Sequence, residues 1–197
     1  MSKGDLARIT TNYARFEEIC GELGDRSELV LRMIDHLANR LAIAPASTKE
    51  RLHSAYPGGL IAHSLKVLDL AQKLSKSLNM PVSDESLKIT CLFHDLGKVG
   101  DLETDYYLPQ DNDWRRDNLG EMYTINWDLQ KMPHEDRSLW LLQHFGITLT
   151  MDEWVAIKIH NGPYADANEY YSMAEPTLAL LVHMADRLSV QDEKGLI

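Results

Sequence analysis

Cysteine and runs of positive charge are both scarce in this chain of 197 residues. The two cysteines, Cys20 and Cys91, form no Cys-x-x-Cys pair and lie in stretches of helical apolar spacing, so we expect two buried, reduced thiols. The longest run of adjacent basic residues is the pair Arg115-Arg116. A protein that follows duplex nucleic acid needs a basic stripe, so the sequence predicts no such partner.

Long apolar runs are also missing from the sequence. No stretch approaches the roughly eighteen apolar residues that span a bilayer, so no membrane partner is expected. The first five residues are not followed by the apolar core of a secretory signal. These features predict a cytoplasmic protein.

The composition is that of a globular domain with an acidic balance. Hydrophobic residues make up 44% of the chain and charged residues 25%, which is enough for one real core. The 20 basic and 30 acidic residues give a net charge of −10. A bound metal ion reverses the sign of charge locally, so a small phosphorylated substrate is compatible with this balance. The length predicts one domain, with at most a small appendage.

Apolar residues recur every three to four positions along most of the chain, which predicts an all-α fold. With capping residues, glycines and prolines as boundaries, the predicted helices cover residues 5–20, 27–41, 48–55, 60–78, 83–95, 136–145, 150–159 and 176–190. The segment 100–135 lacks a clear period and holds several Tyr and Trp residues. We expect it to be a long polar and aromatic loop with one short hairpin, acting as a lid or a partly mobile segment.

Histidine and aspartate residues stand at three notable positions in the predicted helices. His63 follows a Gly-Gly turn at a helix start, and His94-Asp95 ends another helix, with Lys98 three residues beyond Asp95. Asp186 lies in an otherwise apolar helix, where a carboxylate is costly unless it pairs with an arginine or binds a metal. Neutral imidazoles with carboxylates suit a divalent metal that keeps positions open for water. The pattern therefore favours a metal-dependent enzyme.

The sequences Gly-Gly-Leu-Ile-Ala-His-Ser and Leu-Phe-His-Asp-Leu-Gly-Lys, with Asp186 far downstream, resemble the HD-domain superfamily of metal-dependent phosphohydrolases. The resemblance spans about residues 51–190. It implies an HD-type helical bundle as the catalytic domain over 46–197. Residues 1–45 show no such resemblance and are expected to form a helical extension that packs on the core or serves an oligomer contact, so a homo-oligomer stays open.

The resemblance also implies a set of metal ligands. The first site would be formed by His63, His94, Asp95 and Asp186. Asp95 would bridge to a second ion bound by His134 and His160, although a helix cap for His134 and a helix-dipole partner for His160 are open alternatives. The implied cofactor is one or two divalent ions, with manganese, iron, nickel, cobalt and magnesium as the candidates.

Lys98 is the residue through which the resemblance implies catalysis, together with Asp95. Lys98 would neutralise charge that builds on a phosphoryl group, whereas the alternative is a solvated lysine at a helix end. Two further histidines receive no assigned role. His53 precedes the Gly-Gly turn and is a candidate for the rim of the pocket, and His183 is a candidate for a contact that orients Asp186.

The His-Asp-x-Gly-Lys form is similar to the phosphodiesterase branches of the superfamily. The predicted reaction is therefore hydrolysis of a phosphoester bond in a nucleotide or similar small substrate by metal-activated water, with a phosphodiester favoured. Candidate substrate contacts are the residues Arg115, Arg116, Tyr123 and Tyr164. The sequence His-Asn-Gly-Pro-Tyr from position 160 departs from the pattern of cyclic dinucleotide hydrolases.

Two other functions share this pattern of residues. One is a diiron oxygenase of the HD type, which iron content and oxygen uptake would distinguish. The other is a non-catalytic regulatory or binding module on the same scaffold. Such modules usually lose ligands, whereas the histidines and aspartates of the first site are all present here.

Overall fold

The computed structural model describes residues 2–162 and 165–196. Its helices, in chain order, are α1 (Lys3–Gly21), α2 (Ser27–Ile43), α3 (Gly59–Leu78), α4 (Asp84–Phe93), α5 (Asp113–Leu119), α6 (His134–His144), α7 (Met151–Lys158) and α8 (Thr177–Glu193). Shorter 3-10 helices are η1 (Gly24–Arg26), η2 (Leu96–Val99) and η3 (Asp166–Tyr171), and the strands are β1 (Tyr107–Pro109) and β2 (Tyr123–Ile125). The predicted all-α fold is confirmed.

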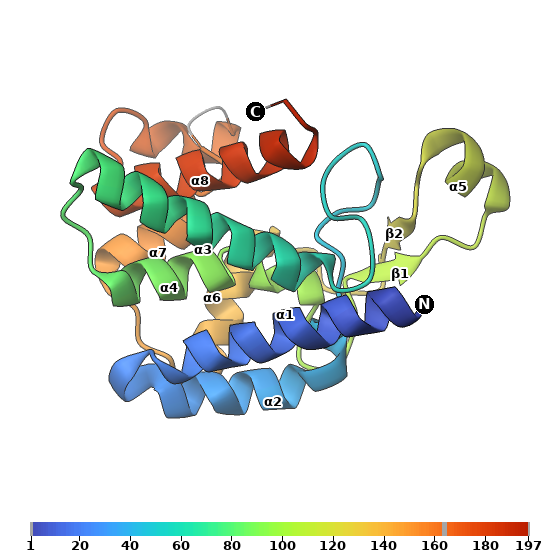
Figure 1. Ribbon diagram of the computed structural model, residues 1–197, viewed down its shortest axis with the longest axis horizontal. Helices are drawn as coiled ribbons and strands as arrows, with labels where there is room; N and C mark the ends of the chain where they lie inside the picture. Colours follow the sequence, from blue (N-terminus) through green and yellow to red (C-terminus); the bar gives the residue numbers. More distant parts are fainter. Residues whose placement is uncertain (1, 163–164, 197) are drawn as a thin grey trace.

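The helices are arranged in layers around the central pair α3 and α4 (Figure 1). The N-terminal helices α1 and α2 lie on one side of this pair, and α7 and α8 lie on the other. α6 packs on η2, the short helix that follows α4. One continuous core joins these helices and includes side chains from α1 and α2. Within the described ranges, no helix is both long enough and apolar enough to cross a membrane.

Phe16 of α1 shows how the N-terminal helices join this core. Its ring meets Phe93 of α4 edge to face, with the ring centroids 5.7 Å apart. Removing a buried ring of this size costs about 3–5 kcal/mol, because it leaves a cavity that the surroundings fill only in part. Cys20 and Cys91 are also buried and unpaired, as predicted, and burial raises the pKa of both thiols.

The predicted helix over 48–55 is wrong, because this segment forms a loop between α2 and α3. The N–H of Ala46 donates to the carbonyl of Ser54 at 3.1 Å, and Lys49 forms an isolated antiparallel bridge with Glu121. Ser54 has a φ of 44°, which no right-handed helix accommodates. A helix of eight residues is marginal without tertiary packing, and the hairpin offers its backbone groups better partners.

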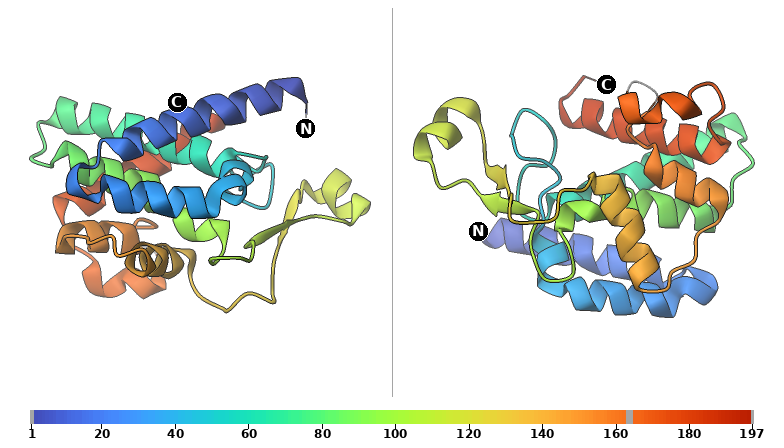
Figure 2. Two further views of the ribbon diagram at one scale, coloured as in Figure 1. Left: turned by 90° about the horizontal axis from the view of Figure 1, so that it is seen from below. Right: turned by 180° about the vertical axis from the view of Figure 1, so that it is seen from behind.

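Residues 100–135 contain the predicted hairpin, with a helix inserted between its strands. β1 and β2 pair antiparallel, with Tyr107 opposite Ile125. Between them, α5 begins where the side chain of Asn112 accepts a hydrogen bond from the backbone N–H of Arg115, and it ends at Gly120 with a φ of 60°. The hairpin and α5 project beyond the helical body in every view (Figures 1 and 2).

Candidate metal centre

The structure brings all of the predicted metal ligands together at the centre of the bundle. His63 lies on α3, His94 and Asp95 follow α4, His134 begins α6, His160 follows α7, and Asp186 lies on α8. Because α3, α4 and α8 pack against one another, side chains on their facing surfaces meet. The side chains of His63, His94, Asp95 and His160 are buried, and those of Asp186 and His134 are 16% and 22% exposed. The cluster is thus deeply buried and reaches solvent at Asp186 and His134.

One oxygen of Asp95 faces a first pair of histidines. Its Oδ2 lies 3.6 Å from Nε2 of His63 and 3.5 Å from Nε2 of His94. These two nitrogens are 3.3 Å apart, and Oδ1 of Asp186 lies 3.1 Å from Nε2 of His63. Two imidazole nitrogens and two carboxylate oxygens therefore surround one point.

The other oxygen of Asp95 faces a second pair of histidines. Its Oδ1 lies 3.1 Å from Nε2 of His134 and 3.4 Å from Nε2 of His160. Those two nitrogens are 3.2 Å apart. The carboxylate of Asp95 thus joins two sets of nitrogen atoms, one through each oxygen.

The remaining ring nitrogen of each histidine has an acceptor, which fixes the tautomer. Nδ1 of His94 lies 2.9 Å from the carbonyl of Cys91, and Nδ1 of His160 lies 2.8 Å from that of Ile157. A carbonyl only accepts, so these Nδ1 atoms carry the protons and leave Nε2 with a lone pair.

Side-chain acceptors near Nδ1 fix the tautomers of His63 and His134 in the same way. The hydroxyl of Ser189 donates to the carbonyl of Asp186 at 2.8 Å and so presents a lone pair to Nδ1 of His63, 3.3 Å away. The carboxylate of Glu135 lies 3.3 Å from Nδ1 of His134. Contacts of this kind orient metal-binding histidines and raise their basicity.

This donor set fits divalent cations. With Nδ1 protonated, the Nε2 lone pairs of each histidine couple point at each other across 3.2–3.3 Å, which is repulsive unless a cation lies between them. Oδ1 of Asp95 is buried and lacks a hydrogen-bond partner among the described residues, a costly state that a cation would relieve. Groups of three ligand atoms form around His63 with His94 and Asp186, and around His94 with Asp95 and His160.

Lys98 supplies the nearest positive charge. Its Nζ lies 2.6 Å from Oδ2 of Asp95, and its side chain is 11% exposed. Burial opposes ionisation of Asp95, but Lys98 and His94 outweigh it and hold the pKa of this carboxyl well below its usual range. Burial likewise opposes ionisation of Asp186, but hydrogen bonding to His63 lowers its pKa. Both carboxyl groups are therefore ionised at neutral pH.

Gly97 explains how α6 comes close enough for His134 to reach Asp95. A Cβ at Gly97 would collide with the backbone carbonyl of His134. The N–H of Gly97 donates to the hydroxyl of Ser138 at 2.8 Å, and that hydroxyl lies 3.0 Å from the carbonyl of His94. The small residue thus lets η2 and α6 pack backbone to backbone at the centre.

His53 is the residue that sequence reasoning left without a role and that the structure places at the centre. Its ring centroid lies 4.7 Å from that of His63, and it groups with His63 and Asp95 as a further set of potential ligands. Burial lowers the pKa of His53 to about 3, so the ring is neutral. Its only sequence signal is its position just before the Gly-Gly turn. His183 bonds through Nδ1 to the carbonyl of His160 at 2.9 Å, in place of the expected contact to Asp186.

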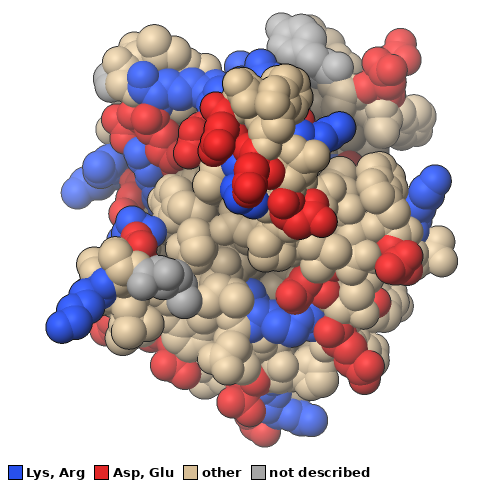
Figure 3. Space-filling model, turned by 90° about the vertical axis from the view of Figure 1, so that its right-hand side faces the viewer, with Lys and Arg blue, Asp and Glu red and all other residues tan. Residues whose placement is uncertain are grey.

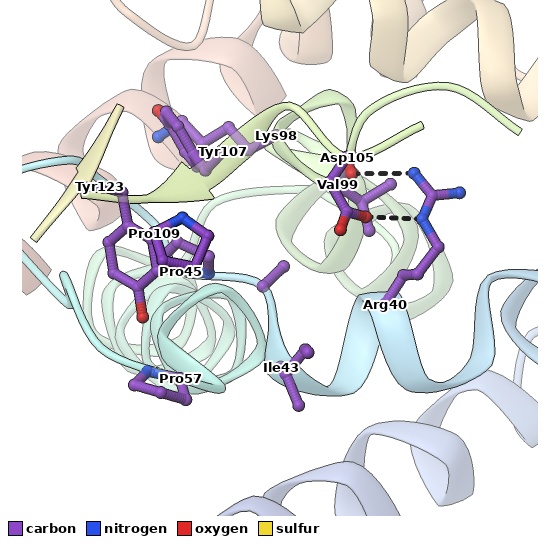
Figure 4. A pocket seen from close by; sticks show the side chains of 11 residues that line it. Arg40, Ile43, Pro45, Pro57, Lys98, Val99, Asp105, Tyr107, Pro109 and Tyr123 are labelled. Carbon is purple, nitrogen blue, oxygen red and sulfur yellow. Dashed lines mark hydrogen bonds and ion pairs between the residues drawn. The ribbon is translucent and has the colours of Figure 1, made fainter. Parts of the chain in front are cut away.

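A mostly apolar pocket of about 240 Å³ adjoins the centre at Lys98 (Figure 4). Tyr107 and Tyr123 of the hairpin line it. The ion pair between Arg40 and Asp105, with Nε 2.6 Å from Oδ1, lies at one end. Tyr123, a predicted substrate contact, thus lines the same pocket as Lys98.

Two of the other predicted substrate contacts lie elsewhere. Arg115 and Arg116 are on α5, at the far end of the hairpin, where Arg115 pairs with Glu121 at 2.8 Å and Arg116 pairs with Asp113 (Figure 1). The structure does not bring either arginine to the pocket, and their role stays a prediction. Tyr164 lies outside the described residues.

Comparison with known proteins identifies one family. The model of the HD domain family matches residues 60–191, which is more than half of the chain and includes every predicted metal ligand. No curated protein and no solved structure matches the chain. HD domains bind divalent metals, and the buried histidines and aspartates described above could hold them.

Proposed function

The chain belongs to the HD domain family, and we propose that it is a metal-dependent phosphohydrolase with two ion sites that share Asp95. The observation that carries the proposal is the placement of the two oxygens of Asp95. Oδ2 faces His63 and His94, and Oδ1 faces His134 and His160. Each set leaves positions open for water or substrate, as catalytic metal sites do.

The residues around the centre have distinct tasks. Divalent ions there would supply positive charge for phosphoryl oxygens and lower the pKa of a bound water toward about 7. Asp95 and the four histidines hold the reacting groups at fixed positions because their own orientations are set by backbone and side-chain acceptors. Lys98, 2.6 Å from Asp95, is within reach of a phosphoryl group bound at the centre and would stabilise its developing negative charge.

The pocket beside Lys98 supports a nucleotide as the substrate. Its walls are largely apolar and include the rings of Tyr107 and Tyr123 with Pro45 and Pro57. A planar base attached to a phosphate would place its ring between such side chains while the phosphate lies at Lys98. A sugar phosphate without a base would leave these surfaces unused.

The charge distribution on the surface near the hairpin favours a small substrate rather than a nucleic-acid duplex. Acidic and basic side chains alternate over this face without a continuous basic stripe (Figure 3). The His-Asp-x-Gly-Lys form of the motif favours a phosphodiester bond as the one that is cleaved.

The test is a mass-spectrometric screen of the protein with Mn²⁺ against nucleoside phosphates, cyclic mononucleotides, cyclic dinucleotides and short oligonucleotides. Turnover of one class should disappear in Asp95→Asn. It should persist in Asp152→Asn, a control at the exposed start of α7. Manganese binding with no turnover of any compound would contradict the proposal and direct attention to iron content and oxygen uptake.

A further inference from the structure

His53 carries an unsatisfied buried nitrogen and lies beside the candidate metal centre. Its Nε2 is buried and has no hydrogen-bond partner among the described residues. The ring tilts by 42° against that of His63, and a ligand atom of His53 lies within 4.8 Å of those of His63 and Asp95. A buried polar atom without a partner destabilises the fold, so a native protein that keeps one there needs a reason for it.

Hydrogen bonds hold the loop at His53 and at the residue after it. The hydroxyl of Ser47 donates to the carbonyl of His53 at 2.5 Å. The next residue, Ser54, donates from its N–H and its hydroxyl to Glu193 of α8, at 3.0 and 2.7 Å. Ser54 holds its positive φ of 44° only within this arrangement, and Gly59 of α3 has no Cβ because one would collide with the carbonyl of Ser54.

Strain at Ser54 and an unsatisfied nitrogen at His53 thus occur at adjacent positions. Both features are unfavourable, and such features cluster where a site must be held in a fixed geometry. The hydrogen bonds from Ser47 and to Glu193 hold the backbone that carries the ring. The arrangement suits a side chain whose partner is a bound ligand.

His53 differs from the metal-facing histidines in one decisive respect. Each of the four has an acceptor at Nδ1 that forces a lone pair onto Nε2, as shown for His94 and His160 by their carbonyl partners. Within the described ranges Nε2 of His53 has no hydrogen-bond partner, so no contact there prevents it from carrying the ring proton. The set around His63 already holds four ligand groups, and a fifth group, the imidazole of His53, would fill the position that substrate needs.

A cavity of about 580 Å³ adjoins His53. It is lined by His53 and by Tyr123, which also lines the pocket beside Lys98. Lys98, which pairs with Asp95, and His53, which groups with His63 and Asp95, thus both lie beside the cluster at which a phosphoryl group would bind.

We propose that His53 is a substrate-binding residue, whose Nε2–H donates a hydrogen bond to a phosphoryl oxygen bound at the metal centre. This inference rests on the proposed phosphohydrolase function. The loop fastened by Ser47 and Glu193 positions the ring for this contact.

The experiment measures binding of inorganic phosphate to the manganese-loaded protein by calorimetry, together with manganese content. His53→Phe keeps the ring shape and removes the donor, and His53→Gln keeps an N–H donor; His144→Gln, at the exposed end of α6, is the control. We expect unchanged manganese content in all variants. The phosphate dissociation constant should rise about tenfold or more in His53→Phe, as for a lost hydrogen bond to a charged group, and most of the affinity should return in His53→Gln.

Equal phosphate affinities in wild type and His53→Phe would overturn the inference alone. A loss of one manganese ion in His53→Phe would show that His53 binds the metal and would overturn the inference. Absence of phosphate binding by the manganese-loaded wild type would overturn the proposed function as well. If the phenylalanine variant does not fold, His53→Ala is measured and interpreted in the same way.

Discussion

Replacing Lys98 by methionine should destabilise the protein only when no metal is bound. Lys98 is the one lysine or arginine in the described chain that forms an ion pair with Asp95, whose side chain is 2% exposed. Removing one partner of a buried ion pair costs about 3–5 kcal/mol, because the other charge is left buried and uncompensated. Since the lysine side chain keeps 11% exposure, we expect the lower end, about 3 kcal/mol.

Metal changes this expectation because divalent cations would replace the ammonium as counter-charge to Asp95. In the presence of saturating Mn²⁺, the loss of stability in Lys98→Met should fall below about 1 kcal/mol, the range of a weakly contributing pair. Without metal, the thermal midpoint should fall by about 6–12 °C, since about 2–4 °C corresponds to 1 kcal/mol for a chain of this size.

The assay is urea unfolding of wild type and Lys98→Met, each with excess chelator and with Mn²⁺. The control is Lys88→Met, because Lys88 pairs with Glu22 and Asp84 at 2.8 and 2.6 Å, and both carboxylates are largely exposed. Its effect should be small and independent of metal. An equal loss of stability in Lys98→Met with chelator and with Mn²⁺ would refute the reasoning. It would show that Asp95 is a structural ion-pair partner of Lys98.

Three further perturbations test other parts of the centre. Gly97→Ala should cost about 1–3 kcal/mol in urea unfolding and weaken manganese binding, because its Cβ collides with the carbonyl of His134; an unchanged variant would contradict the packing argument. His134→Ala should lower the manganese content measured by mass spectrometry by one ion, and retention of the full content would remove His134 from the ligands. The metal-free protein should lose stability as pH falls from 6.5 toward about 3, because His53 has a pKa of about 3 when folded and 6.5 when unfolded, so only the unfolded state takes up the proton. The contribution of His53 to the free energy of unfolding changes by about 1.4 kcal/mol per pH unit, and His53→Phe should reduce the slope of stability against pH by that amount. An identical dependence of stability on pH in the variant would show that His53 is not shielded from solvent.

Helix positions were largely predictable because their signals are local. Thr150 and Glu153 form a capping box at the start of α7, and Ser83 caps α4, so both starts are marked by residues close together in the sequence. The segment 48–55 was mispredicted because its partners are remote: Lys49 bridges to Glu121, and Ser54 bonds to Glu193, which is 139 positions away. No window of neighbouring residues contains those contacts.

The metal centre was predictable in its residue types but not in its internal order. The pattern of His94-Asp95 with His63 indicated a metal-dependent enzyme, because buried imidazoles with carboxylates have few other uses. The tautomer of His63 depends on Ser189, which is 126 positions away in the sequence. His53 lies beside the centre because of the conformation of the loop that carries it. The apolar pattern of the sequence did not indicate that conformation.

The most direct test of the two-ion centre is anomalous diffraction from crystals of the protein grown with Mn²⁺. We predict two manganese peaks, one among His63, His94 and Asp186 and the other between His134 and His160, with one oxygen of Asp95 bound to each. Absence of manganese from the histidine cluster, or a single ion that Asp95 does not contact, would contradict the account.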